Sequence, residues 1–173
     1  MTIIDTPRLR LRPWGDTDAP ALFELARHPR IGMLCGWKPY KHIDDAHEAL
    51  STFLAAPDSY AVTLASTGEL VGSIALRIDT DSPEASVADI GYWIGAPYWG
   101  NGYATEAGRA IIDRARELGV STIILKYFDG NDASRRVSEK LGFTWQSREE
   151  DVDYPLIGKR LTVHRTELAL AAR

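Results

Sequence analysis

Two glycines, Gly100 and Gly102, stand in the segment APYWGNGYATEA, directly before a segment with the apolar spacing of a helix. The first backbone amides of a helix have no intrahelical acceptor, and the helix dipole adds partial positive charge there. Glycines leave such amides uncovered, so the stretch from Gly100 to Ala104 is suited to bind a phosphate or pyrophosphate. It fits neither the Walker A pattern, because Tyr103 follows Gly102, nor the three-glycine dinucleotide fingerprint. A strand-to-helix turn that merely favours glycine is the alternative.

Side chains that bind metals or form covalent intermediates are few and scattered. Cys35 is the only cysteine, which excludes an intrachain disulfide and a thiolate metal cluster. His42 and His47 accompany Asp44 and Asp45, but histidines five residues apart are poorly placed to share one metal ion on a helix. We therefore expect no metal site.

The elements that must position the glycine loop follow from apolar periodicity and turn signals. In 104–118 the apolar residues recur at helical spacing, and Gly119 stands where a helix-ending glycine belongs. The segment 120–128 is a continuous β-branched run typical of a central strand. The other expected strands are 7–14, 59–65, 70–78, 86–95, 143–150 and 158–170, and the other expected helices are 21–28, 42–54 and 131–143, with a loop at 80–85.

This order of elements, βααβββαβαββ, predicts an α/β (α+β) fold with a single mixed central sheet of about seven strands. The helix between the fourth and fifth strands implies a right-handed parallel crossover. The chain has 173 residues and no internal repeat or linker, so we expect one domain over residues 1–173.

Composition narrows the class of partner. The net charge of −4, without a basic block, gives no indication of nucleic-acid binding. No segment approaches the roughly 18 apolar residues of a membrane span, and the start MTIIDTPRLRLR lacks the apolar run of a signal peptide. We expect a cytoplasmic protein with neither a nucleic-acid nor a membrane partner.

Three separated motifs resemble those of one enzyme family. The segment IGYWIGAPYWGNGYATEA, followed about two dozen residues later by NDASRRVSEKLGF, closely resembles the GCN5-related N-acetyltransferase (GNAT) superfamily. The opening TPRLRLRPW and the acidic GDTDA are similar to the start of its RimJ/RimL-type branch. The resemblance implies the GNAT fold, whose sheet splays between strands four and five, and it implies acetyl-CoA as the co-substrate.

The resemblance also implies that the glycine loop binds the pyrophosphate of acetyl-CoA. The family pattern of Gln or Arg, then Gly, then Gly or Ala falls here on Trp99, Gly102 and Ala104. Trp99 departs from that pattern, and Asn101 stands where basic side chains often assist, but backbone amides perform the binding. The residues expected to bind the cofactor are Trp93, Ile94, Gly95, Trp99, Gly100, Asn101, Gly102, Tyr103, Ala104, Asn131 and Ser134.

Each of these assignments has an alternative in which the residue has only a structural role. Trp93, Ile94 and Gly95 match a strand whose backbone pairs with the pantetheine arm and whose Ile94 amide polarises the thioester, or they are an ordinary strand end. Asn131 matches a family asparagine that binds the cofactor arm, and asparagine is also a favoured helix N-cap. The basic residues of the last helix meet the ribose phosphate or form a solvated face; these are Arg135, Arg136 and Lys140.

Two side chains are implied to transfer protons. Ser134 matches a serine that protonates the departing CoA thiolate, with a solvated first-turn serine as the alternative. Asp89 stands where relatives often have glutamate, or it is an exposed strand residue. A carboxylate acting through water suffices to deprotonate an α-amine with a pKa of about 7.8. Glu106 is a rival base that the helix dipole already explains. Cys35 has no recognisable base partner, so no acetyl-enzyme is expected.

Two segments are expected to wall the acceptor side. The loop 30–42 carries Trp37 and Tyr40 as large apolar surfaces, and the connection 147–160 carries four carboxylates followed by Tyr154. The carboxylates form either a negative mouth that attracts a cationic amine or a solvated loop. They are Glu149, Glu150, Asp151 and Asp153, and the residues expected to bind the acceptor are Trp37, Tyr40, Asp89, Glu150 and Tyr154.

The implied function is an acetyl-CoA-dependent N-acetyltransferase that transfers acetyl directly to a primary amine in a ternary complex. The acceptor, a protein N-terminal α-amine or a small-molecule amine, stays open. The alternative is a sensor module of the same fold that binds acyl-CoA without turnover. Homodimers are common in this family, and the oligomeric state stays open as well.

Overall fold

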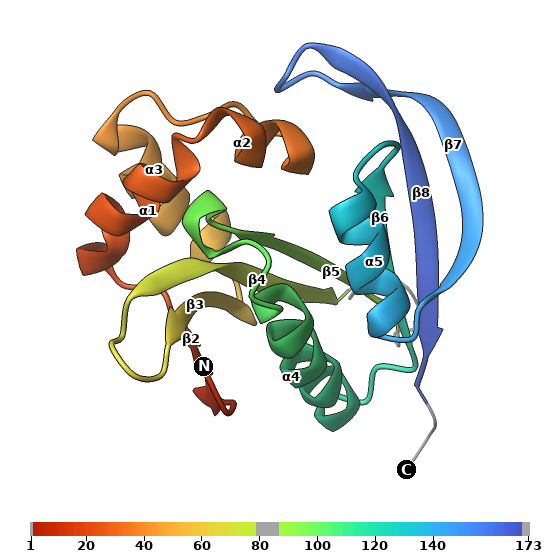
Figure 1. Ribbon diagram of the computed structural model, residues 1–173, viewed down its shortest axis with the longest axis horizontal. Coiled ribbons are helices and arrows are strands. Elements are labelled where there is room, and N and C mark those ends of the chain that lie inside the picture. Colours follow the sequence, from red (N-terminus) through yellow and green to blue (C-terminus); the bar gives the residue numbers. More distant parts are fainter. Residues whose placement is uncertain (1, 79–86, 171–173) are drawn as a thin grey trace.

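An eight-stranded sheet runs through the computed structural model, which describes residues 2–78 and 87–170 (Figure 1). The strand order is β1-β2-β3-β4-β5-β6-β8-β7, and every neighbouring pair is antiparallel except β5 and β6, which are parallel. The strands are β1 (Ile4–Asp5), β2 (Leu9–Pro13), β3 (Ser59–Leu64), β4 (Leu70–Ile78), β5 (Val87–Ile94), β6 (Thr122–Phe128), β7 (Thr144–Tyr154) and β8 (Lys159–Ala169).

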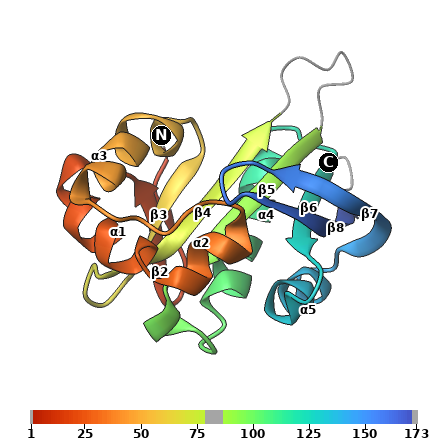
Figure 2. The ribbon, with the colours of Figure 1, turned by 90° about the horizontal axis from the view of Figure 1, so that it is seen from above.

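Helices cover both faces of this sheet and bury two apolar clusters. One cluster lies between the sheet and α4, and the other lies between the sheet and the pair α1 and α3. Figure 2 shows α1 and α3 at one end of the molecule, the β7–β8 hairpin at the other and α2 between them. The α-helices are α1 (Ala19–Ala26), α2 (Pro29–Cys35), α3 (Ile43–Ser51), α4 (Tyr103–Glu117) and α5 (Asp132–Lys140), and the 3-10 turns are η1 (Asp16–Asp18), η2 (Phe53–Ala55) and η3 (Ala96–Tyr98).

The central elements lie where the sequence predicts them. The mixed sheet, the parallel crossover from β5 through α4 to β6, and the hairpin of β3 and β4 are confirmed. Gly119 has a φ of +77°, which is the left-handed conformation expected of a glycine that ends a helix. The predicted loop 80–85 and Ser86, the first residue of a predicted strand, lie outside the described residues.

Three expectations about elements were wrong. The sheet has eight strands rather than seven, because the two-residue β1 pairs with β2 and is too short to show any periodicity. The segment 30–42 is not all loop, since α2 begins at Pro29, where His28 accepts a hydrogen bond from the Arg30 amide. The strand expected at 143–150 continues to Tyr154, so the acidic run lies on β7 and not in a connection.

The splay between β5 and β6 is confirmed by the strand register. The two strands pair only from Val87 with Thr122 to Ile90 with Leu125. Beyond that point 91–94 pairs with β4 alone, so one side of β5 has no neighbouring strand. Among the described residues, no helix is long and apolar enough to cross a membrane.

Candidate active site

A cavity of about 1270 Å³ opens at the splay, more than the roughly 300–1,000 Å³ of a typical single-ligand pocket. Strand alternation divides its walls between the two faces of the sheet. Ile90 and Tyr92 belong to the cluster that packs beneath α4, whereas Trp93 belongs to the cluster beneath α1 and α3. We call the part near Tyr92 and Ser134 the α4 side, and the part near Asp89 and Trp93 the α2 side. The cavity therefore has room for two ligands that approach from opposite faces.

The glycine loop forms one end of the α4 side. Gly100 and Gly102 have φ values of +80° and +79°, a conformation that other residues rarely adopt. A Cβ at Gly100 would have no protein atom within 4 Å, and one at Gly102 would lie 3.6 Å from Arg8 Nη2. Gly102 is the N-cap of α4, so the amides of 103–105 have no acceptor within the helix, and these residues line the cavity. The loop thus presents uncovered amides at the positive end of a helix dipole.

Trp99 ties this loop to the end of β5. Its indole Nε1 donates a hydrogen bond of 2.6 Å to the carbonyl oxygen of Ile94. The next amide, that of Gly95, donates to Val71 on β4, so the backbone groups of Ile94 point the other way, into the splay. The tryptophan that departs from the family pattern therefore has a structural role, and the Ile94 amide stays directed at the cavity.

Asn131 and Ser134 lie at the start of α5, opposite the loop. The Asn131 side chain accepts a hydrogen bond of 3.2 Å from the Ser134 amide, so the helix-cap reading of Asn131 is correct whatever else this residue does. Ser134 Oγ accepts a hydrogen bond of 3.0 Å from Tyr92 Oη. Burial raises the pKa of Tyr92 to about 12, so its phenol stays protonated near neutral pH. Because Tyr92 donates, the proton of Ser134 is left for another acceptor in the cavity.

Asp89 and Arg77 form an ion pair on the α2 side. They stand opposite each other on β5 and β4, and Arg77 Nη2 donates to Asp89 Oδ1. The Arg77 side chain is 61% exposed and the Asp89 side chain 30%, so both reach solvent within the cavity. A Cβ on Gly91 would lie 2.7 Å from Arg77 Nη2, which means that the guanidinium lies directly over the Gly91 backbone.

Aromatic side chains line the same side of the cavity as this ion pair. Trp37 and Trp93 make an edge contact with ring centroids 6.3 Å apart, and Tyr40 packs behind Trp37 at 5.3 Å. Tyr154 packs edge-on against Phe128 at 4.7 Å. The α2 side therefore combines a charged floor with apolar walls.

Some residues expected at the site lie outside the cavity lining. Gly95 is buried against Leu25, and Tyr40 contributes only from behind Trp37. The Asn101 side chain donates to the Tyr98 carbonyl at 3.0 Å and so braces the loop from within. Glu150 is exposed and pairs with Arg148 at 3.1 Å.

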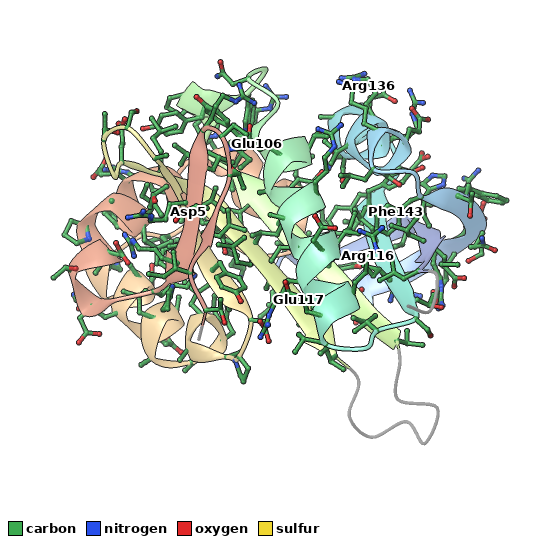
Figure 3. The ribbon with its side chains drawn as sticks, turned by 90° about the horizontal axis from the view of Figure 1, so that it is seen from below. Asp5, Glu106, Arg116, Glu117, Arg136 and Phe143 are labelled. Atoms are coloured by element: carbon green, nitrogen blue, oxygen red, sulfur yellow. The ribbon has the colours of Figure 1, made fainter. Side chains whose placement is uncertain are left out.

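Glu106, the rival base, is engaged in structural contacts. It accepts hydrogen bonds from the Thr6 hydroxyl and from the Arg8 amide and guanidinium. Burial opposes ionisation of Glu106, but these bonds outweigh it and lower its pKa. Figure 3 shows Glu106 near the start of α4, and Arg136 of α5 on the same side of the molecule.

A family model for the acetyltransferase (GNAT) domain matches residues 8–144 of the chain. The chain belongs to the GNAT acetyltransferase family. The predicted resemblance to this superfamily is therefore confirmed, and the chain is an acetyltransferase.

Relatives and solved structures agree with this membership. The chain is 30% identical over 147 residues to the uncharacterized N-acetyltransferase YoaA of Bacillus subtilis, covering 82% of each protein. An acetyltransferase (GNAT family) from Bacillus anthracis has the same fold, with a TM-score of 0.86 at 21% identity, over 97% of this chain and 98% of the other. RimL, a ribosomal L7/L12 acetyltransferase solved with coenzyme A, gives a TM-score of 0.84 at 19% identity, over 99% and 100%.

Within this GNAT domain, the sequence does not predict three residues of the cavity wall, Tyr92, Arg77 and Arg30. Tyr92 lies 42 residues from its partner Ser134, and the pairing of Arg77 with Asp89 depends on a strand register that spacing does not reveal. Arg30 lies with its guanidinium 5.1 Å from the Trp99 ring centroid and supplies a cation beside the loop. The sequence predicts a loop at Arg30, and only the folding of α2 brings its side chain to Trp99.

Proposed function

We propose that this chain transfers an acetyl group from acetyl-CoA directly to a primary amine in a ternary complex. The observation that carries the proposal is the two-sided cavity at the splay, which is lined from opposite faces of one sheet. A proton donor candidate, Ser134, lies on the α4 side, and a carboxylate, Asp89, lies on the α2 side. The coenzyme A held by the RimL structure, which shares this fold, supports the choice of acyl donor.

The residues of the α4 side fit a pyrophosphate and an extended arm. The open space over Gly100 and Gly102 would admit phosphate oxygens, and the amides of 103–105 would donate to them. Arg30 and Arg136 would add positive charge nearby. The free edge of β5 at 91–94 would pair with the amide groups of the pantetheine arm, and we assign the Ile94 amide to the thioester carbonyl.

The proton balance of the reaction assigns one role to each side of the sheet. The amine nitrogen forms a bond to the acetyl carbonyl carbon, and the bond from that carbon to the CoA sulfur breaks. Asp89 accepts the proton that the amine loses, directly or through a water molecule. Ser134 donates its proton to the departing thiolate, so the products are an amide and the CoA thiol. Asp89 then releases its proton to water in the open cavity, and Ser134 regains a proton from that water, so both groups return to their starting states. Tyr92 orients the Ser134 hydroxyl for this donation.

Direct transfer is favoured over a covalent acetyl-enzyme by the state of Cys35. Its sulfur lies 3.9 Å from the Tyr92 carbonyl oxygen, inside the cavity. The Cys35 side chain is exposed to solvent, but the protein around the sulfur raises the pKa of the thiol to about 12 by desolvation, which makes it a poor nucleophile near neutral pH.

Steady-state release of CoA thiol, measured with and without a mixture of primary amines, tests the proposal. We expect release only when both acetyl-CoA and an amine are present, with initial rates that fit a sequential mechanism. Binding of acetyl-CoA without amine-dependent release would instead indicate a sensor. A burst of thiol release without amine would indicate an acetyl-enzyme.

A further inference from the structure

The floor of the α2 side carries a cation and an anion next to each other. Arg77 donates to Asp89 through one nitrogen and one oxygen only, and Arg77 has no other hydrogen-bond partner among the described residues. A guanidinium has five N–H donors and a carboxylate has two oxygens, so both groups retain bonding capacity toward the cavity. The pair can therefore receive a ligand that itself carries both charges.

Gly91 keeps this pair on the floor of the cavity. The guanidinium lies over its backbone, where a Cβ would come within 2.7 Å of Nη2 and 2.8 Å of Nη1. An exposed cross-strand ion pair contributes little stability and does not require such an approach. The absence of a side chain at Gly91 instead affects the site. It lets the Arg77 guanidinium lie flat on the strand, where it can contact the same ligand as Asp89.

Charges of both signs lie on this side. The charged residues that line it are Arg77, Asp89 and Lys126, and Lys126 forms no ion pair with any residue in the described ranges. Glu149 lies close enough to Tyr154 to act on it electrostatically, so a further carboxylate stands beside the lining. A ligand with an ammonium and a carboxylate matches the charges present.

Apolar residues extend the same side beyond the ion pair. Trp37, Trp93 and Leu54 line this extension, and Phe53, which is 64% exposed, stands at its rim. We call this extension the apolar chamber. It favours an apolar substituent on a ligand, because binding removes the apolar surfaces of the substituent and of the chamber from water.

The β7–β8 hairpin reaches across to α2 and bounds this side. A Cβ on Gly36, the residue that follows α2, would lie 2.8 Å from the Tyr154 ring, so hairpin and helix are in direct contact. This contact narrows the entrance to the α2 side. A small molecule can pass such an entrance more easily than a segment of a folded protein.

We propose that the acceptor is a free α-amino acid with an apolar side chain. Asp89 binds its ammonium group, Arg77 binds its carboxylate and the chamber of Trp37, Trp93 and Leu54 holds its side chain. The proposal rests on the proposed acetyl transfer and adds the acceptor class to it. Arg77 is then the residue that selects for the carboxylate.

Acceptors with the same side chain isolate the effect of the carboxylate when kcat/KM is expressed per neutral amine, because the amide also has a weaker base as its α-amine. We would measure kcat/KM for phenylalanine, phenylalanine amide and phenethylamine, and for leucine and leucine amide, with a peptide beginning in phenylalanine alongside. We expect the free acids to exceed the amides and the peptide by about tenfold or more, which is the usual range for a hydrogen bond to a charged group. Amides or the peptide acting as well as the acids would overturn the proposal, whereas no thiol release with any amine would overturn the proposed function itself.

Two variants and a control test whether Arg77 causes the preference for the free acid over the amide. Arg77→Gln should remove the advantage of the acid over the amide, mainly through KM. Any effect on Asp89 as a base would alter both acceptors alike and leave their ratio unchanged. Gly91→Ala should reduce the ratio without changing charge, because the added Cβ displaces the guanidinium. Arg148→Gln removes the same charge from exposed β7 and should leave the ratio as it is. A ratio unchanged in folded Arg77→Gln would refute the assignment.

Discussion

Ser134 is held at two points: its backbone amide donates to the Asn131 side chain, and its hydroxyl accepts a hydrogen bond from the phenol of Tyr92. We expect Ser134→Ala to lower kcat about tenfold to a hundredfold, at the low end for general acids because a thiolate with a pKa of about 8.5 needs only modest help. The KM for acetyl-CoA should stay nearly constant, since in the proposed site backbone amides bind the phosphates. Steady-state kinetics at saturating amine measures both quantities.

Two further variants locate that effect. Tyr92→Phe keeps the Ser134 hydroxyl but removes its donor, so its kcat should lie between those of the parent and Ser134→Ala. Ser147→Ala changes an exposed serine on β7 and should leave kcat unaltered. Equal turnover of Ser134→Ala and the parent would remove Ser134 from the mechanism.

Asp18 is the buried carboxylate that joins β2 to the start of α1. Burial opposes its ionisation, but two hydrogen bonds of 2.7 Å from Arg12 and one from the Gly15 amide outweigh burial and lower its pKa. Asp18→Asn should therefore reduce the free energy of unfolding at pH 7 by about 1–3 kcal/mol. A lowered folded-state pKa means that this stability is present above the unfolded value of about 3.8 and is lost as pH falls through the folded value.

Urea unfolding at pH 7 and pH 3 checks this sign. The difference between parent and Asp18→Asn should shrink at the lower pH. Asp113→Asn, which breaks an exposed pair with Arg116, should change stability by no more than about 0.5 kcal/mol at either pH. A loss for Asp18→Asn that stays the same at both pH values would argue against the ion pair as its cause.

Prediction from sequence works at single residues when the partner is close along the chain. The cap formed by Asn131 spans three residues, and the residue types alone indicate it. The bond from Tyr92 to Ser134 and the contact of Arg30 with Trp99 join distant segments, and only tertiary packing forms them. The ion pairs of the acidic run are likewise not evident from the sequence. Arg160, for example, binds Asp151 at 2.6 Å across the hairpin.

At the scale of elements, the loop before α4 depends on two left-handed glycines. Gly102→Val places a β-branched side chain in the space proposed for a phosphate, so we expect affinity for acetyl-CoA to fall at least about tenfold. Gly119 ends the same helix with a φ of +77° and open space around it, which makes Gly119→Val a matched control for backbone strain.

Both valine variants should lose about 1–2 kcal/mol of stability, because an L side chain at positive φ is strained. Calorimetric titration with acetyl-CoA should show weakened binding for the Gly102 variant alone. Normal affinity in a folded Gly102→Val protein would mean that the phosphates lie elsewhere.

The two elements that the sequence does not reveal differ in their physical cause. The helix α2 contains Gly32, whose Cβ would lie 2.4 Å from the Trp37 carbonyl oxygen, so the turn of the chain after α2 explains a glycine that weakens the local helix signal. The strand β7 continues through an acidic run because β8 pairs with it, with Asp151 at a φ of +59° where the register shifts. In β7, pairing with a neighbouring strand overrides local preference.

At the scale of the whole molecule, ligand binding should stabilise the fold by mass action. At a hundredfold excess over its Kd, acetyl-CoA would add about 2.7 kcal/mol. A chain of this size shifts its Tm by about 2–4 °C per kcal/mol, so we expect a rise of about 5–10 °C in a thermal melt. A melt that millimolar acetyl-CoA leaves unmoved would count against the proposed acyl donor.

The sheet acts as a partition between the two sides of the cavity, and this has an evolutionary consequence. The matched family model stops at residue 144, before most of the β7–β8 hairpin that contributes Tyr154 to the α2 side. Under the proposed function, substitutions in that hairpin or near Phe53 can change what the α2 side accepts, while the glycine loop beyond the sheet is untouched. A lineage built on this scaffold can thus drift between acceptors in small viable steps, because no step requires the donor site to be reinvented.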